Sequence, residues 1–331
     1  MIISRTPFRI SFFGGGTDYP AWYENNSGAV LSTTIDKYCY LTCRYLPPFF
    51  RHKHRIVYSK VENVESIDEI KHPAVRACLK FMDIEKGIEV HHDGDLPAKT
   101  GLGSSSSFSV GLLHSLYALK GIMPTRHRLG SEAIHLERNL LNENVGSQDQ
   151  IAAAYGGFNK ISFKQNGEFQ VEPITIPKAR LDALNDSIML YFTGFSRIAS
   201  KIARKQIKNT PKKAKELGRM HDMVDDARNI LVGNDDLNCF GELLHETWQL
   251  KRSLTDKIST PEVDDIYNEA REAGAIGGKL LGAGGGGFMI LFVQPEMQKS
   301  VRKRLNKLLE VKFRFDTSGS QIIFYRDPSV G

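Results

Sequence analysis

Two glycines and four consecutive serines stand together in the segment GLGSSSS, from Gly101 to Ser107. Because glycine has no Cβ, the backbone here can bend tightly and bring its N–H groups against a bulky anion. Apolar residues then recur at helical spacing from Phe108 to Tyr117, so a helix is expected to begin at the serines. The free N–H groups and the positive dipole end of a helix N-terminus bind phosphate. A serine that only caps a helix is the alternative for a single Gly-Ser pair, but the full pattern predicts a nucleotide-phosphate loop.

Two familiar nucleotide-binding motifs do not fit this sequence. The Walker pattern places a glycine directly before Lys-Ser or Lys-Thr, whereas Lys99-Thr100 follows an alanine and precedes the glycines. The segment from Gly282 to Gly287 formally matches G-x-G-x-x-G, but a dinucleotide fingerprint lies between a strand and the helix that follows it. Here the order is reversed, because a predicted helix at 263–273 comes first and a predicted strand at 288–293 comes after. We therefore exclude a P-loop and a Rossmann site.

Three further segments combine glycines with groups that can bind a ligand. The glycines at 14–16 precede Thr17 and Asp18, and Asp18 can accept hydrogen bonds from sugar hydroxyls. Asp149 follows a glycine at 146 and could orient or deprotonate a hydroxyl. The structural alternatives are a glycine turn closed by the Asx side chain and a helix cap. The third segment, LLGAGGGGF at 280–288, holds four successive glycines whose ordering costs much conformational entropy, so it predicts close backbone approach to a ligand.

Alternating strands and helices are expected to carry these segments. β-Formers dominate the first half, and apolar stripes at helical spacing dominate the second half. Thr125 is expected to cap a helix, and Thr260-Pro261 is expected to begin another. The chain is expected to divide into two α+β domains at 1–182 and 183–331. The predicted strands are 8–13, 30–35, 39–45, 55–59, 87–92, 161–163, 169–171, 288–293 and 321–325. The predicted helices include 73–82, 105–120, 126–142 and 295–309.

Composition excludes several classes of protein. The 331 residues are 41% hydrophobic and 25% charged, which is ordinary for a globular protein, and no apolar run approaches the ~20 residues that span a bilayer. The four cysteines form no C-x-x-C pair, so reduced thiols in a cytoplasmic protein are expected. A net charge of +6 permits nucleic-acid binding, but the basic clusters at 51–55 and 201–215 lack interleaved aromatics. We expect a small-molecule substrate, no nucleic acid and no membrane, and the sequence carries no feature that sets an oligomeric state.

Taken together, these motifs resemble those of the GHMP kinases. That family has three motifs in this order, and the middle one, P-x-x-x-G-L-G-S-S, is matched from Pro97 to Ser105. The segment from Phe8 to Tyr19 resembles the first motif of galactokinase, except that its Glu-His pair is replaced by two glycines, so its exact sugar contacts do not carry over. Gly146 to Gln150 matches the G-x-x-D-Q that holds the proposed base. GGGTDYP, VGSQDQIAAAYGGFN and FTGFSRIASKIARKQ are more specifically similar to the D-glycero-D-manno-heptose 7-phosphate kinases of that family.

The resemblance implies a two-domain α+β fold with the active site in the cleft between the domains. The N-terminal domain would resemble the second domain of a small-subunit ribosomal protein, and the C-terminal domain would be ferredoxin-like. ATP and Mg²⁺ would be the cofactors. Asp149 would be the base, and Arg9 would stabilise charge on the transferring phosphoryl group. Ser105 and Glu137 would bind Mg²⁺. The residues implied for ATP binding are Pro97, Lys99, Gly101, Leu102, Gly103, Ser104, Ser105 and Ser106, and those assigned to the substrate are Gly15, Gly16, Thr17, Asp18, Arg197, Gly284 and Gly285.

The implied reaction is transfer to the C1 hydroxyl of D-glycero-D-manno-heptose 7-phosphate, which gives the 1,7-bisphosphate for nucleotide-activated heptose. Arg197 follows a predicted strand-to-helix turn, and its guanidinium could bind a distal phosphate through two donors. The alternative is that Arg197, Lys201 and Lys205 only decorate a solvated helix. A fucokinase-like or uronate kinase and a non-catalytic sugar or nucleotide sensor of the same fold remain open as functions, although intact Asp149 and Glu137 argue against a sensor.

Overall fold

The two longest strands of the protein run side by side in the first of two sheets. In the computed structural model, which describes residues 1–194 and 199–326, strand β1 (Ile2–Phe13) pairs antiparallel with strand β2 (Gly28–Tyr45). Strand β2 unites the two segments, 30–35 and 39–45, that the sequence predicted as separate strands. Its residues are largely buried up to Ile35 and alternate between buried and partly exposed beyond it, so one strand passes from the molecular interior to a half-covered sheet.

The rest of the first sheet is built around this pair. In the described part of the chain it has nine strands, with the main order β13-β1-β2-β5-β3-β4, and β6 and β12 also pair with β2. Among the ladders formed by the described residues, only the one between β3 and β5 is parallel. The added strands are β3 (His54–Val57), β4 (Val61–Val64), β5 (Ile88–Gly94), β6 (Asn159–Phe163), β7 (Phe169–Pro173), β12 (Phe315–Asp316) and β13 (Gln321–Tyr325).

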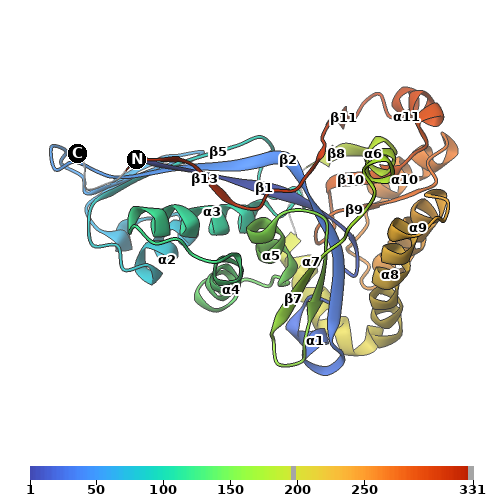
Figure 1. The fold of residues 1–331 in the computed structure, drawn as a ribbon, viewed down its shortest axis with the longest axis horizontal. Helices are drawn as coiled ribbons and strands as arrows, with labels where there is room; N and C mark the ends of the chain where they lie inside the picture. The colour runs from blue at the N-terminus through green and yellow to red at the C-terminus, as the bar shows by residue number, and fades with distance from the viewer. Residues whose placement is uncertain (195–198, 327–331) are drawn as a thin grey trace.

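Helices of the first half lie along one face of this sheet (Figure 1). The central one, α3, has 13 of its 16 residues buried, because it packs against β1 and β2 on one side and other helices on the other. The helices of this layer are α2 (Pro73–Phe81), α3 (Ser104–Leu119), α4 (Arg126–His135) and α5 (Gln148–Tyr155). The first half also contains the short helix α1 (Pro20–Asn26) and the 3-10 turn η1 (Ile67–Glu69).

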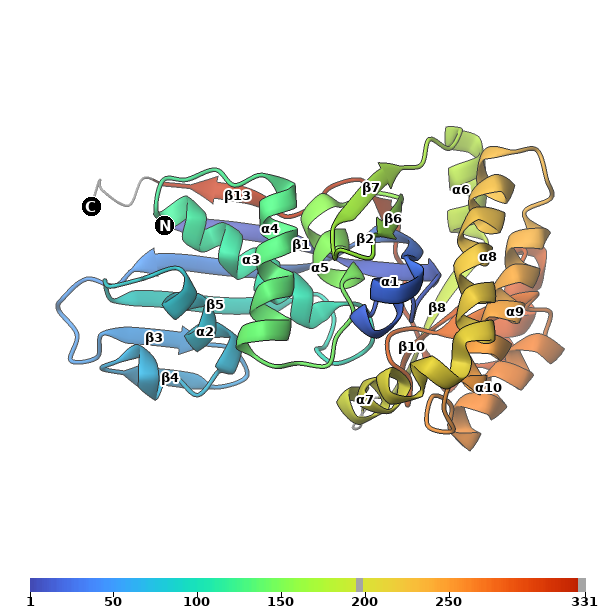
Figure 2. The same ribbon diagram turned by 90° about the horizontal axis from the view of Figure 1, so that it is seen from below.

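The second sheet is antiparallel and is covered by long helices (Figure 2). Its strand order is β11-β8-β10-β9, and the apolar strand β10 is buried along its whole length. Its strands are β8 (Ile188–Gly194), β9 (Gly277–Leu280), β10 (Gly287–Phe292) and β11 (Leu309–Glu310). The helices of this half are α6 (Lys178–Asp186), α7 (Ala199–Asn209), α8 (Ala214–Val232), α9 (Asn238–Ser253), α10 (Pro261–Glu272) and α11 (Gln298–Arg304), with the turns η3 (Thr210–Lys213) and η4 (Pro295–Met297).

The mixed α+β architecture predicted from the sequence is confirmed. The end of the chain returns from the second sheet to the first, where β12 pairs with β2 and β13 pairs with β1 (Figure 1). The division into domains at 1–182 and 183–331 therefore describes the main body of each half, and that boundary stays a proposal.

Local sequence signals explain where several helices begin. The Thr125 hydroxyl accepts a hydrogen bond from the Arg128 N–H at 3.1 Å at the start of α4, and Thr260 accepts one from the Val263 N–H at 3.3 Å at the start of α10. Both caps are confirmed, as is the apolar stripe of α8, whose members are all at most 1% exposed. That stripe consists of Leu217, Met220, Val224, Ala227 and Leu231.

Two predicted helices end earlier than their patterns indicated. The helix expected at 126–142 is α4 followed by a π-helical turn, η2 (Leu136–Leu140), which shifts the side chains after it by one position around the axis. The helix expected at 295–309 ends at Arg304, and Leu309 lies instead in strand β11, where it pairs with Phe192 of β8. In the second case strand pairing with β8 replaces the helical pattern, so tertiary contacts override the local preference.

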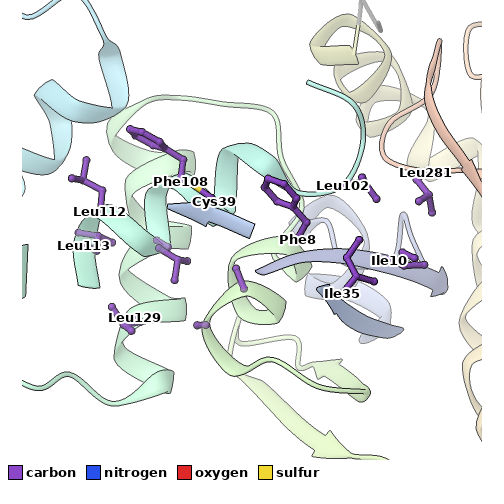
Figure 3. Close-up of a cluster of buried hydrophobic side chains, with 14 of the residues drawn as sticks. Phe8, Ile10, Ile35, Cys39, Leu102, Phe108, Leu112, Leu113, Leu129 and Leu281 are labelled. Atoms are coloured by element: carbon purple, nitrogen blue, oxygen red, sulfur yellow. The ribbon is translucent and has the colours of Figure 1, made fainter. Parts of the chain in front are cut away.

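One apolar core joins the two halves close to the glycine-rich loops. Leu102, between the two glycines of the phosphate loop, and Leu281, beside the glycine run, are each 1% exposed and belong to the same cluster as Phe8 and Ile10 (Figure 3). The two loops are therefore anchored to the interior by one leucine each. Burying a leucine side chain contributes roughly 1.5–3 kcal/mol, which offsets part of the entropy cost of ordering the neighbouring glycines.

Nothing in the described segments is both long enough and apolar enough for a membrane-crossing helix. The thiols of the four cysteines are free, and three of them (Cys39, Cys43 and Cys78) are buried. Burial raises the pKa of each of these three thiols, so they are packing residues rather than nucleophiles.

Candidate active site

The glycine-serine segment forms a loop that opens helix α3. Gly101 and Gly103 have φ angles of +85° and +76°, so both lie in the left-handed region that glycine adopts without strain. Gly103 is the N-cap residue of α3, and the helix begins at Ser104, whose Oγ accepts a hydrogen bond from the Lys99 N–H at 3.2 Å. The N-terminus of α3, the serines and Lys99 thus stand together, as an anion-binding loop requires.

The glycine run of the C-terminal half packs directly against this loop. A Cβ atom on Gly101 would lie 2.5 Å from the carbonyl oxygen of Leu281, and one on Gly282 would lie 2.5 Å from the Cα of Gly101. The Phe288 N–H also donates to the Thr100 carbonyl at 3.0 Å. The sequence predicted close approach of this run to a ligand, and the close approach that the structure shows is to the backbone of the phosphate loop. Glycine is required because two backbones meet here without room for a side chain.

Arg9 and Asp149 form a two-pronged ion pair beside the phosphate loop. Arg9 Nε donates to Asp149 Oδ1 at 2.7 Å, and Nη2 donates to Oδ2 at 2.6 Å. The third guanidinium nitrogen of Arg9, Nη1, donates a hydrogen bond to the Gly101 carbonyl at 2.7 Å. Arg9 is only 4% exposed, whereas the Asp149 side chain is 26% exposed, so the carboxylate is the member of the pair that a substrate can reach. A Cβ on Gly103 would come within 3.5 Å of Asp149 Oδ2, which measures how near the carboxylate lies to the loop.

A cavity of about 540 Å³ opens next to this pair. Its wall combines β1 and the glycine turn after it with the starts of α3 and α5, and with α7, α9 and β9 from the C-terminal half. The site predicted to lie between two halves of the chain is therefore hollow in the structure. Of the residues that the sequence assigned to the site, the cavity wall contains Arg9, Gly15, Gly16, Asp18, Lys99, Ser105 and Asp149.

The side of the cavity near Asp18 is polar and suited to hydroxyl groups. Asp18 is 1% exposed, and its carboxylate accepts hydrogen bonds from the Gly16 N–H at 2.9 Å and from Gln148 Nε2 at 3.0 Å. Burial raises the pKa of Asp18. Within the described segments, the buried Ser11 Oγ and Gln148 Oε1 have no hydrogen-bond partner. Because buried polar atoms are normally paired, these two atoms indicate where hydroxyls of a ligand would bind.

Glu137 lies beneath the serines of the loop, on the π-helical turn η2. It is completely buried, and it accepts hydrogen bonds from Ser106 Oγ at 2.9 Å and from Gln150 Nε2. Burial raises the pKa of Glu137 to about 7. The π turn matters because it inserts one residue into the helix, a change that is frequent at functional sites and that re-aims the side chains on the turn.

The raised pKa of Glu137 predicts a pH-dependent loss of stability. Below the ordinary pKa of 4.5 the carboxyl is neutral in both folded and unfolded chains, and the penalty for burying its charge grows until the pH passes about 7. At pH 8 we expect the free energy of unfolding of Glu137→Gln to exceed that of the wild type by on the order of 2 kcal/mol, so the variant should unfold at a higher urea concentration. At pH 4.5 the two proteins should differ little. Urea titrations at the two pH values measure this. The surface variant Glu172→Gln is the control, and equal effects at both pH values would contradict the burial penalty.

Three residues assigned to the substrate, Thr17, Gly284 and Gly285, do not line the cavity. The Thr17 hydroxyl bonds the carbonyls of Gly14 and Ala29 at 2.8 Å each and is fully buried, so it closes the glycine turn instead of facing the cavity. Gly285 donates to the Ile258 carbonyl at 2.9 Å, and a Cβ on Gly284 would lie 2.7 Å from the same oxygen. Gly282 and Ala283 line the cavity in their place.

The remaining assignments stay predictions. Pro97, Leu102, Gly101, Gly103, Ser104 and Ser106 belong to the loop but are not part of the cavity wall. The hydroxyl that contacts Glu137 is that of Ser106, while Ser105 is exposed and faces the cavity. Arg197 lies outside the described residues. Of the two lysines that follow it, Lys201 is exposed and Lys205 forms an ion pair with Asp256.

Sequence reasoning missed two cations in the cavity wall, Lys251 and Lys279. They are 7% and 3% exposed. A signal for Lys251 was present, because it continues the spacing of the apolar stripe Leu244 and Trp248 in α9 and therefore lies on the buried face of that helix. Lys279 interrupts an otherwise apolar and glycine-rich short strand, β9. A lysine at a core position is rarely unpaired, so both positions could have been marked as functional.

The loop region also contains oxygen ligands that suit Mg²⁺. The Glu137 carboxylate is completely buried and accepts a hydrogen bond from Ser106, and the hydroxyls of Ser105 and Ser106 lie at the start of α3. Mg²⁺ is a hard cation that proteins bind through one or two carboxylates together with the phosphates of a nucleotide. This donor set fits the metal that the resemblance implies.

Comparisons with known proteins agree with this geometry. Two family models match the chain, GHMP kinases N terminal domain over residues 70–157 and GHMP kinases C terminal over residues 223–311. The chain is 30% identical over 322 residues to D-glycero-alpha-D-manno-heptose 7-phosphate kinase of Campylobacter jejuni, an alignment that covers 92% of this chain and 93% of that protein.

Solved structures show the same arrangement of elements. The structure of a D-glycero-D-manno-heptose 1-phosphate kinase from Bacteroides thetaiotaomicron superposes with a TM-score of 0.81 and covers 99% of this chain and 100% of that one, and at 23% identity this is a similarity of fold. A putative sugar kinase from Campylobacter jejuni is 26% identical, with a TM-score of 0.70 over 97% of this chain and 98% of that one.

Proposed function

This chain belongs to the GHMP kinases and is an ATP-dependent sugar kinase, and we propose that it transfers the γ-phosphoryl group of ATP to the C1 hydroxyl of D-glycero-D-manno-heptose 7-phosphate. The observation that carries the proposal is the Arg9–Asp149 pair, which borders the phosphate loop through Gly101 and the cavity through Asp149. The similarity to the heptose 7-phosphate kinase of C. jejuni supports the choice of acceptor.

The residues of the site divide the work of phosphoryl transfer. This reaction needs positioning and charge neutralisation more than covalent chemistry. The N-terminus of α3 and its serines hold the nucleotide phosphates. Asp149 accepts the proton of the attacking hydroxyl, and Arg9 fixes the orientation of that carboxylate while adding positive charge close to the transferring group. Asp18, Gln148 and Ser11 bind the hydroxyls of the sugar.

Mg²⁺ belongs to the proposal as the second cofactor. Bound at the loop, it would neutralise charge on the phosphates of ATP. Glu137 and Ser105 would hold it, and Ser106 orients the Glu137 carboxylate through its hydrogen bond at 2.9 Å. Loss of the proton of Glu137, whose pKa is about 7 without a metal, accompanies binding, because the metal prefers the charged carboxylate.

The two serines predict separable effects. We expect Ser105→Ala to raise the KM for Mg²⁺-ATP about tenfold with little change in melting temperature, because its hydroxyl is exposed toward the cavity. We expect Ser106→Ala to lower stability by about 1 kcal/mol, because it breaks a buried hydrogen bond to Glu137. Steady-state kinetics over a Mg²⁺ series and thermal unfolding measure the two effects. If Ser105→Ala lowers only the melting temperature, Ser105 caps the helix and does not serve the metal.

A coupled assay of ADP release over a panel of acceptors tests the proposed function. The panel contains D-glycero-D-manno-heptose 7-phosphate, the unphosphorylated heptose, fucose, galactose, glucuronate and other sugar phosphates. We expect the highest kcat/KM with the heptose 7-phosphate, and the phosphorus NMR spectrum of its product should contain an anomeric phosphate signal. A higher kcat/KM with fucose or a uronate would assign the chain to another sugar kinase of the same fold.

The proposal includes a cytoplasmic location and excludes nucleic acid as a partner. Free, buried thiols are the usual state of cysteines in a reducing compartment. Binding to random RNA, measured in a salt titration, should be negligible at physiological ionic strength, and tight binding with a steep salt dependence would contradict the small-molecule assignment.

A further inference from the structure

Two lysines from separate elements of the C-terminal half meet in the wall of the cavity. Lys251 comes from the last turn of α9, and Lys279 comes from β9. Both line the cavity, and both are almost completely buried, with 7% and 3% of their surface exposed. Lysine is seldom buried to this extent without a partner of opposite charge.

The ammonium groups are held by backbone carbonyls. Lys251 Nζ donates to the carbonyls of Leu280 at 2.8 Å and Gly282 at 2.6 Å, and Lys279 Nζ donates to the Phe12 carbonyl at 2.7 Å. Within 1–194 and 199–326, no carboxylate forms an ion pair with either group. Since an ammonium group has three N–H donors, Lys251 retains one and Lys279 retains two for a ligand.

The electrostatics of the site call for an anion next to these lysines. Burial lowers the pKa of Lys251 to about 7 and that of Lys279 well below its ordinary value. The positive charge of Lys251 lowers the pKa of Lys279 further, and the positive charge of Arg9 lowers the pKa of both lysines. The Asp18 carboxylate opposes these effects on both lysines, and Lys99, Glu143 and Asp149 are the other charged groups of the cavity wall. An anionic ligand would favour the charged lysines and remove the cost of burying them unpaired.

We propose that Lys251 and Lys279 form an anion-binding subsite that receives the phosphate group which the acceptor sugar already carries. The inference rests on the proposed function and deepens it, because it identifies the residues that would select a phosphorylated acceptor. A phosphate dianion accepts charge-assisted hydrogen bonds from both ammonium groups, and the carbonyls that hold them keep their positions fixed before the substrate arrives.

The position of the lysines favours the acceptor over the nucleotide. The phosphates of ATP have their own donors at the N-terminus of α3. Lys279 donates a hydrogen bond to the carbonyl of Phe12. The preceding residue, Ser11, has an unpartnered hydroxyl on the side of the cavity near Asp18, where the acceptor sugar is proposed to bind. Asp18, the other acceptor-side residue, is the carboxylate whose charge acts on both lysines. The subsite thus adjoins the groups that would bind the sugar hydroxyls.

Charge-removing variants test the subsite. In Lys251→Gln and Lys279→Gln the amide retains a donor for the backbone carbonyl while the positive charge is lost. We expect each variant to raise the KM for the sugar phosphate about tenfold or more, since a hydrogen bond to a charged group is lost. The KM for ATP and the kcat/KM for the unphosphorylated sugar should change less than about twofold. Lys120→Gln is the matched control, because Lys120 also donates to a backbone carbonyl, that of Met82 at 2.9 Å, but lies outside the cavity wall.

A measurement on the wild type keeps the proposal testable if a variant does not fold. Inorganic sulfate, which is a dianion at neutral pH, should inhibit the enzyme competitively with respect to the sugar phosphate at saturating ATP. Absence of competition would overturn the subsite. It would also be overturned if the variants lose kcat/KM by the same factor with phosphorylated and unphosphorylated acceptors. A fall in kcat alone would overturn it as well, because the lysines would then act on the transferring group.

The acceptor panel separates failure of this inference from failure of the proposed function. If the wild type rejects heptose 7-phosphate but uses another sugar phosphate, the heptose assignment falls, and the lysine variants are then tested with that substrate. If the wild type uses only unphosphorylated sugars, the subsite falls while the sugar kinase remains.

Discussion

Replacing Asp149 by asparagine is expected to lower the turnover number by roughly 10²-fold or more while leaving ATP binding intact. Asparagine has the same shape, and its amide oxygen can still accept one of the two hydrogen bonds from Arg9, but its amide nitrogen cannot accept the other. It cannot take the proton of the attacking hydroxyl. The coupled assay of ADP release gives kcat, and calorimetric titration with a non-hydrolysable ATP analogue gives the affinity for the nucleotide.

A second aspartate provides a matched control for this substitution. Asp264 also pairs with an arginine, Arg252, at 2.8 Å, and its side chain is 31% exposed against 26% for Asp149, but it lies outside the cavity wall. Asp264→Asn should therefore retain near-wild-type turnover. Near-wild-type turnover in Asp149→Asn would instead leave Asp149 with a structural or minor orienting role.

Replacing Arg9 by methionine is expected to lower turnover by about 10²–10³-fold, because a fixed positive charge next to the transferring group is removed. The substitution also frees the Gly101 carbonyl and leaves the Asp149 carboxylate without its partner. Breaking a buried pair is costly, but Asp149 remains partly in contact with solvent, so we expect a loss of about 2 kcal/mol in stability. Kinetics and urea unfolding measure the two effects separately.

Two further variants test whether Arg9 acts through its positive charge and whether it acts together with Asp149. Arg9→Lys keeps the charge but not the two parallel hydrogen bonds, and it should recover only part of the lost turnover. The double variant Arg9→Met/Asp149→Asn should lose about as much as the more damaging single substitution, because the two residues act as one unit. Losses that multiply would indicate that the two side chains contribute independently.

Patterns that depend on neighbouring residues were predicted correctly from the sequence. The Thr260 cap and the apolar stripe of α8 follow from hydrogen bonds and spacing within one helix, so they were visible without the fold. The start of a helix at the glycine-serine segment belongs to the same class, since its glycines and the start of α3 are adjacent in the chain, and phosphate binding there stays a prediction. Arg9, Asp18 and Asp149 were found because each lies in a short motif that resembles a known family, and the structure places all three in one cavity wall.

For some residues the structure shows a contact that their motif did not specify. The glycine run was expected to approach a ligand, which stays a prediction, and the contact that the structure shows is between Gly282 and Gly101 of the phosphate loop. Ser105 and Glu137 were both expected to bind Mg²⁺, and this stays a prediction; the hydroxyl that contacts Glu137 directly is that of the next residue, Ser106. A shift of one residue on a helix turns a side chain by about 100°, which a motif alone does not resolve.

The sequence by itself determined the family, the α+β class, the glycine-serine loop that opens a helix, and the motifs that contain Asp149 and the arginine beside it. Only the tertiary structure decided that Lys251 and Lys279 enter the cavity wall, that Thr17 turns away from it, and that the end of the chain pairs with β1. The physical reason is the range of the interactions. Spacing along the chain sets helix periodicity, caps and turns, whereas these contacts join distant segments and form only when the sheets and helices pack around a common core.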